Sequence, residues 1–175
     1  GFSVTALTPN NGVGVVYGSS YAAPQIAGLA TLLYQKYKQQ FSALPDASLI
    51  KAIMLNTARD LGNPGPDYTY GFGKPDAYRA ANTLASNLYA EGTVNQGTVK
   101  THSFNVPPDA SVLKVTLSWT DKEGSPVAAQ AIVNNLDIKL VTPAGDTVLP
   151  WKLNPANPKG PAFRGIDDIN TNEQI

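Results

Sequence analysis

One serine of this sequence stands where a turn runs into an apolar helical segment. The turn reads Gly18-Ser19-Ser20-Tyr21-Ala22-Ala23-Pro24, and residues 25–38 continue it with helical spacing. In the first turn of a helix the backbone N–H groups are unpaired and the helix dipole is positive, so a serine hydroxyl there lies beside a site that can stabilise an oxyanion. A serine placed in this way can act as a nucleophile.

The same residues also fit a simpler role, which is to start the helix. Serine is a preferred N-cap residue, and it caps a helix without any catalysis. Gly18 lets the backbone approach another molecule closely, and Pro24 is expected in the first turn, where no intrahelical donor is lost. Physical chemistry alone leaves both interpretations open.

The longer string adds a resemblance. From Gly18 to Gly28 the chain closely resembles the serine signature of the subtilisin-like proteases, which usually reads Gly-Thr-Ser-Met-Ala-Ala-Pro-His-Val-Ala-Gly. The resemblance implies that Ser20 is the catalytic nucleophile. Ser19 stands for the usual Thr, Tyr21 for Met and Gln25 for His, so contacts with substrate near the serine can differ from those of the family.

A competing motif is the Gly-x-Ser-x-Gly elbow of the α/β-hydrolases. Residues 18–22 match it loosely, with Ala22 in place of the last glycine. That elbow does not call for Pro24, four residues after the serine. The subtilisin-like signature therefore fits this stretch better.

Three helices are predicted around the signature. Residues 25–38 are apolar almost all round, which is typical of a central helix. A second helix starts at Pro45 and Asp46 and ends near Arg59, and a short third helix, opened by Pro75, runs through about Leu84. These segments, with the glycine-rich turn at residues 70–77, resemble the C-terminal part of a subtilisin-like catalytic domain.

A serine nucleophile needs a base, and the sequence offers one histidine. His102 lies in the alternating stretch of residues 100–106, which predicts a strand with His102 at its surface. In subtilisin-like proteases the triad runs Asp, His, Ser along the chain. The resemblance therefore implies that the Asp, the His and the oxyanion-hole Asn lie upstream of Gly1, and that this polypeptide alone hydrolyses nothing.

The hydrophobic period changes from 3.6 to 2 after residue 87. Residues 112–119 and 136–141 alternate as half-buried strands, and residues 142–146 form a hairpin turn before a return strand at Val148. Short strands without helices between them predict an antiparallel sandwich or jelly roll. Residues 117–121 and 133–138 resemble strings of the β-barrel domain of some secreted alkaline subtilases, and the barrel is expected to be incomplete at Ile175.

The predicted fold is thus an α/β catalytic-domain fragment followed by an all-β, jelly-roll-like domain. Residues 1–90 form the C-terminal segment of the peptidase domain, and residues 91–175 form the truncated barrel domain, with a linker near residues 89–96. The resemblance implies a secreted serine endopeptidase whose partners are polypeptide substrates and the remainder of its own catalytic domain.

Composition excludes several other classes. The formal net charge is zero, with 13 basic and 13 acidic side chains, so nucleic acid is not an expected partner. No apolar run is long enough to cross a membrane, and the absence of Cys removes disulfides and thiol metal sites. No organic cofactor is expected.

A structural calcium ion is a further expectation, because related barrel domains bind calcium. Calcium takes six to eight oxygen ligands. Oxygen-bearing side chains gather at Asp121, Asp137, Asp167, Asp168, Asn170 and Glu173. Turns favour Asp and Asn for backbone reasons too, so these residues also fit a site without metal.

A second interpretation keeps the fold and discards the chemistry. The chain would then be a noncatalytic scaffold or binding module, in which the barrel grips protein or carbohydrate and the serine motif is a relic. Tyr21 and Gln25, which differ from the usual signature, are the sequence features that favour it.

Overall fold

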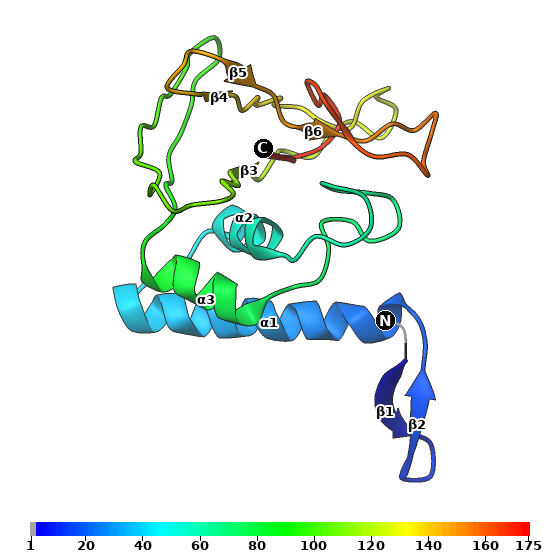
Figure 1. Ribbon diagram of the computed structural model, residues 1–175. Coiled ribbons are helices and arrows are strands. Elements are labelled where there is room, and N and C mark those ends of the chain that lie inside the picture. The colour runs from blue at the N-terminus through cyan, green and yellow to red at the C-terminus, as the bar shows by residue number, and fades with distance from the viewer. Residues whose placement is uncertain (1–2) are drawn as a thin grey trace. The chain divides into compact units, whose positions relative to one another are not determined.

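A computed structural model describes residues 3–175 of the chain. The chain divides into two compact units, Gly1–Pro45 and Asp46–Ile175, and each unit is described separately below (Figure 1). The predicted boundary between residues 90 and 91 concerns domains rather than these contact units, and it stays a prediction.

The first unit begins with a β-hairpin. Strand β1, Val4–Thr8, pairs antiparallel with β2, Gly12–Val16. Residues 9–11 connect the paired Thr8 and Gly12, and Asn10 and Asn11 turn the chain with φ values of 62° and 58°, a left-handed conformation that asparagine tolerates. One face of the hairpin presents exposed apolar side chains: Leu7, Val13 and Val15.

Helix α1, Ser19–Phe41, follows the hairpin and confirms the helix predicted over residues 25–38, extending it at both ends. Its C-cap is Ser42, which has a left-handed φ of 54° and donates its N–H to the Lys38 carbonyl at 2.9 Å. The expectation of burial on every face is wrong for this structure. Leu29 and Leu33, four residues apart, form the buried stripe, whereas Leu32 is 60% exposed.

The second unit contains the other two predicted helices, α2, Ala47–Thr57, and α3, Ala77–Ala85, which pack against each other. Their contact faces supply much of the apolar core: Leu49, Ile50, Ile53, Ala80 and Leu84. The prediction that Pro75 lies in the first turn of α3 is wrong. Asp76 is the N-cap, and Pro75 precedes it.

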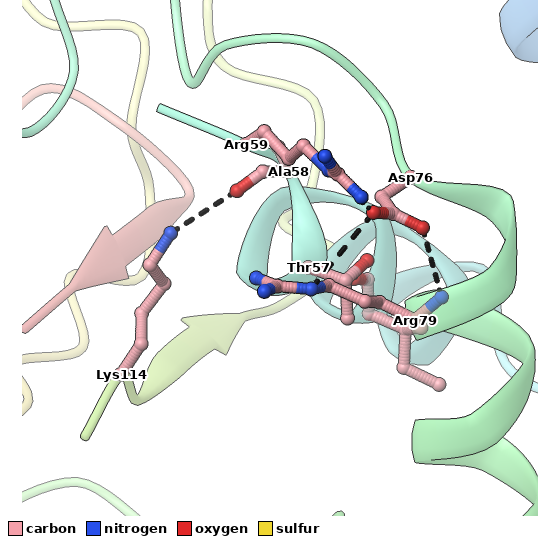
Figure 2. Close-up of polar contacts among 7 residues, drawn as sticks. Thr57, Ala58, Arg59, Asp76, Arg79 and Lys114 are labelled. Carbon is pink, nitrogen blue, oxygen red and sulfur yellow. Dashed lines mark hydrogen bonds and ion pairs between the residues drawn. The ribbon is translucent and has the colours of Figure 1, made fainter. Parts of the chain in front are cut away.

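Asp76 connects the start of α3 with the segment just beyond the end of α2 (Figure 2). Its carboxylate accepts the Arg79 backbone N–H at 3.0 Å, which caps α3, and the Arg59 Nε at 2.8 Å, just beyond the end of α2. The Arg79 N–H and then the Arg59 side chain hold the pKa of Asp76 below its ordinary value. Residues 59 and 74 also exchange two backbone hydrogen bonds, so the first and last residues of the loop between the two helices lie side by side.

The β region of the second unit consists of small antiparallel pairs rather than a closed barrel among the described residues. Strand β3, Thr116–Ser118, pairs with β8, Asn172–Gln174; β4, Leu140–Val141, pairs with β5, Thr147–Val148; and β6, Trp151–Lys152, pairs with β7, Phe163–Arg164. The strands predicted over residues 112–119 and 136–141 are therefore real but shorter. The jelly roll is not confirmed.

Two local predictions in the β region have opposite outcomes. The hairpin turn over residues 142–146 is confirmed, with Thr142 and Asp146 bonded across it and Gly145 at a φ of 92°. The strand predicted over residues 100–106 is wrong, because this segment has no hydrogen-bonded partner strand, although His102 is exposed as expected.

Within the second unit, hydrogen bonds connect α2 and the residue that follows it with residues beside the β3–β8 pair. Lys114 Nζ donates to the Ala58 carbonyl at 3.2 Å (Figure 2), and Lys51 Nζ donates to Thr171 Oγ1 at 3.2 Å. Burial lowers the pKa of both lysines. These contacts join segments that the sequence places in different predicted domains. No helix in the described part of the chain is long and apolar enough to span a membrane.

Candidate active site

Ser20 is the second residue of α1, and its side chain is exposed. Because the first turn has no preceding helical carbonyls, the Ser20 N–H has no partner within the helix. The hydroxyl and an available N–H therefore lie together at the positive end of a helix of 23 residues. This is the local geometry that the sequence predicted for a nucleophile beside an oxyanion site.

The N-cap is Gly18 rather than a serine. Its φ of 135° and ψ of 159° suit glycine, and no side chain caps the helix. A Cβ at this position would meet no atom closer than 3.9 Å, so the backbone conformation and not the lack of space requires glycine. Neither Ser19 nor Ser20 is the N-cap, so N-capping does not explain the serine at position 20.

Pro24 lies deeper in the helix than predicted. It is inside α1, beyond the first turn, so its missing N–H leaves the Ser20 carbonyl without the usual donor four residues on. The expectation that Pro24 costs no hydrogen bond is wrong, because the helix begins at Ser19 and not near residue 24. One residue further on, Gln25 Nε2 donates to the Tyr21 carbonyl at 2.8 Å.

Among the described residues, the unit that carries Ser20 contains no histidine. His102 is exposed, in a segment without secondary structure, and it belongs to the second unit whereas Ser20 belongs to the first. This is the surface position that the sequence predicted for it.

Two of the acidic residues considered for calcium, Asp121 and Asp167, accept several N–H groups of the protein itself. The Asp121 carboxylate accepts N–H groups of Lys122, Val133 and Asn134, of which the Val133 N–H contributes most to lowering its pKa. The Asp167 carboxylate accepts hydrogen bonds from the backbone N–H groups of Ile169 and Asn170 and from the side-chain amide of Asn170. Among residues 3–175 there is no group of three or more His, Cys, Asp or Glu side chains that could hold a metal ion.

Glu173 is different from the other acids in this set. It is 1% exposed; its Oε2 accepts the Ile138 N–H at 2.6 Å, and its Oε1 is buried without a hydrogen-bond partner. Burial, followed by the nearby carboxylates of Asp137 and Asp167, raises its pKa to about 7. Sequence reasoning named this residue only as a possible ligand, and it missed the burial because charged strand residues are usually exposed.

Trp151 in the second unit does not offer an open stacking surface. Trp151 is half-buried, and the Arg164 guanidinium lies 3.6 Å over its ring. The backbone at Gly65 packs so closely that a Cβ there would lie 2.9 Å from the ring. This tryptophan is therefore part of the packing between the loop of residues 62–73 and β6.

Comparison with known proteins agrees with the serine signature. Residues 2–73 match the model of the Subtilase family. The chain is 30% identical to the serine protease/ABC transporter B family protein tagA of Dictyostelium discoideum, over an alignment of 144 residues that covers 71% of the chain. It is 36% identical over 76 residues, 43% of its length, to an extracellular serine protease of Serratia marcescens.

Two further likenesses cover similar shares of the chain. The Neisserial autotransporter lipoprotein NalP of Neisseria meningitidis is 34% identical over 80 residues, 46% of this chain. A solved structure of a lanthipeptide protease is 39% identical and covers 42% of this chain and 22% of its own, with a TM-score of 0.39.

The chain thus carries a subtilase segment, which contains Ser20 and confirms the resemblance seen in the sequence. It spans only 8% of the Dictyostelium protein and 7% of the Neisseria and Serratia proteins.

Proposed function

We propose that this chain is the nucleophile-bearing part of a subtilisin-like serine endopeptidase. The observation that carries the proposal is the position of Ser20 on the first turn of α1, behind a glycine N-cap and inside the segment that matches the Subtilase family. The two requirements, a hydroxyl and an N–H at a positive helix end, are met at one residue.

In the proposed reaction the Ser20 Oγ attacks the carbonyl carbon of a peptide bond. Its proton passes to a histidine upstream of this chain, which then gives it to the leaving amine as the C–N bond breaks. The Ser20 N–H and an upstream asparagine hold the oxyanion, and an upstream aspartate orients the histidine. Water then releases the acyl group and restores the hydroxyl of Ser20.

The remainder of the catalytic domain is proposed as the partner of the first unit. The side chains of Leu7 and Val13 on the β1–β2 hairpin are 82% and 69% exposed, and Leu32 on α1 is 60% exposed. Apolar side chains that gather on one hairpin face are typical of a surface that another part of the protein covers. The fragment alone, without that partner, is expected to be inactive.

Four finer features belong to the same proposal. Residues 91–175 form the β domain that follows the catalytic domain. The protein is secreted, which the names of the Serratia and Neisseria relatives favour. Polypeptides are the substrates. A structural calcium ion also remains a proposal, and a chelator that leaves the melting temperature unchanged would remove it.

A noncatalytic scaffold is the alternative, favoured by the unusual Tyr21 and Gln25 in the signature. Mass spectrometry after treatment of the full-length protein with a fluorophosphonate separates the two, because this reagent modifies only a serine activated by its base. Modification at Ser20, abolished by Ser20→Ala, supports the protease. A folded full-length protein that takes up no label supports the scaffold.

A further inference from the structure

The first turn of α1, which carries Ser20, lacks several of the contacts that usually hold a helix start. Its N-cap, Gly18, has no side chain to accept an N–H, and the first turn contains no acidic residue to interact with the helix dipole. Pro24 also removes the N–H that would donate to the Ser20 carbonyl. The backbone of the nucleophile therefore needs support from elsewhere.

Gln25 provides a contact at this place. Its side-chain Nε2 reaches back one turn and donates to the carbonyl of Tyr21 at 2.8 Å. Tyr21 directly follows Ser20, so the bond holds the peptide unit beside the nucleophile. Neither the Ser20 hydroxyl nor its N–H is touched by this amide, so any effect on the reaction passes through the backbone.

We propose that Gln25 is a positioning residue for Ser20. By holding the Tyr21 carbonyl, its amide fixes the first turn so that the Ser20 Oγ and N–H keep the orientation that acyl transfer requires. A small displacement of a nucleophile from that orientation lowers the rate of the chemical step more than it lowers substrate binding. This inference rests on the proposed function.

The same helix offers a matched control. Thr31 Oγ1 donates to the Ala27 carbonyl at 2.9 Å, a bond of the same kind formed further along α1, away from Ser20. Thr31→Val removes that donor and keeps the shape of the side chain. Gln25→Met likewise removes the amide donor, keeps the length of the side chain and remains a good helix former.

The experiment compares these variants in the full-length protein. For Gln25→Met we expect the rate of fluorophosphonate modification at Ser20 and kcat on a peptide substrate to fall about threefold to tenfold, the range of one net hydrogen bond, with KM nearly unchanged. Thr31→Val should keep the wild-type rates, and Gln25→Lys, whose ammonium can donate to the same carbonyl, should recover most of the loss. Unchanged rates in Gln25→Met, or an equal loss in Thr31→Val, overturn the proposal.

Amide hydrogen exchange keeps the test independent of catalysis. The Gln25→Met variant should speed exchange of the N–H groups of residues 25 and 26, which donate to the first turn, and Thr31→Val should not. If the wild-type protein takes up no label, the protease function fails, and the exchange result alone judges the role of Gln25. Unchanged exchange then overturns it.

Discussion

Thr116 Oγ1 donates to Asn56 Oδ1 at 2.9 Å, although 60 residues separate the two along the chain. Gln174 on β8 donates in turn to the same hydroxyl at 2.9 Å and to the Leu55 carbonyl at 3.3 Å. Strand β3, strand β8 and helix α2 are therefore joined by a short chain of hydrogen bonds. These bonds connect side chains that are buried or half-buried, so they link the β3–β8 pair to α2.

Substitution of the central hydroxyl tests this network. Thr116→Val keeps the shape of the side chain but leaves Asn56 without its donor and Gln174 with one acceptor fewer. We expect the free energy of unfolding to fall by about 1–3 kcal/mol, measured by urea denaturation. The control is Thr147→Val on β5, where the side chain is exposed and the change should stay within about 0.5 kcal/mol. Equal shifts of the two midpoints would contradict the prediction.

The contact between Gly65 and Trp151 leads to a second comparison. Gly65 and Gly71 both have positive φ, 80° and 60°, but a Cβ at Gly65 would lie 2.9 Å from the Trp151 ring and a Cβ at Gly71 would meet nothing within 4 Å. Gly71→Ala should cost about 1–2 kcal/mol for the backbone alone. Gly65→Ala should cost about 1–3 kcal/mol more and shift the tryptophan fluorescence. The idea fails if both variants are equally stable.

Glu173 predicts a pH dependence of stability. Burial raises its pKa from 4.5 in the unfolded chain to about 7 in the fold. Between these values the folded state binds more protons than the unfolded state, so the free energy of unfolding falls as pH rises from about 4.5 to about 7 and levels off above. The full difference between the two pKa values corresponds to a loss of about 3 kcal/mol.

The matched variant for this effect is Glu173→Gln, which retains an acceptor for the Ile138 N–H and does not titrate. The free energy of unfolding of both proteins is measured by urea denaturation at about pH 5 and about pH 7.5. The contribution of Glu173 is the difference between the two proteins in the slope of this free energy against pH. The wild type should lose more stability between these two pH values than Glu173→Gln does. Identical slopes would show that the carboxyl is ionised in the fold at its ordinary pKa.

The isolated chain of 175 residues gives a fourth prediction. Because a serine without its base and orienting carboxylate is a poor nucleophile, the chain alone should cleave a peptide substrate no faster than its Ser20→Ala variant. The measurement is release of a fluorogenic group from a peptide at equal protein concentrations. Peptidase activity that Ser20→Ala abolishes would mean that the chain supplies its own base.

The helices could be predicted from sequence because their signals are local. The repeat of apolar residues located α2 to within a few residues, and Pro75 marked the start of α3 to within two residues. The error at Pro24 arose at a boundary, since small residues such as Ala22 and Ala23 extend a helix as readily as they form a turn.

The β region was harder to predict for a physical reason. Alternation in residues 100–106 and 112–119 shows which side chains could share a face, but a strand forms only where a partner donates and accepts hydrogen bonds. Partner β8 pairs with Thr116–Ser118, and backbone hydrogen bonds from the residues beside β8 extend this contact to Val115 and Trp119 but no further along the predicted strand. The position of Ser20 was predictable because it depends on a local motif, whereas its base depends on residues that are distant in sequence.

The pairing of β3 with β8 also sets an order of folding. Helices α2 and α3 close contacts over short stretches of chain, but the Thr116–Gln174 bond waits for the ends of a segment of 58 residues to meet. Contacts between residues distant in sequence form slowly, because the entropy of closing the loop opposes them. During synthesis the Gln174 amide can therefore reach the Thr116 hydroxyl only after β8 has left the ribosome, so this hydrogen bond forms later than the contact between α2 and α3.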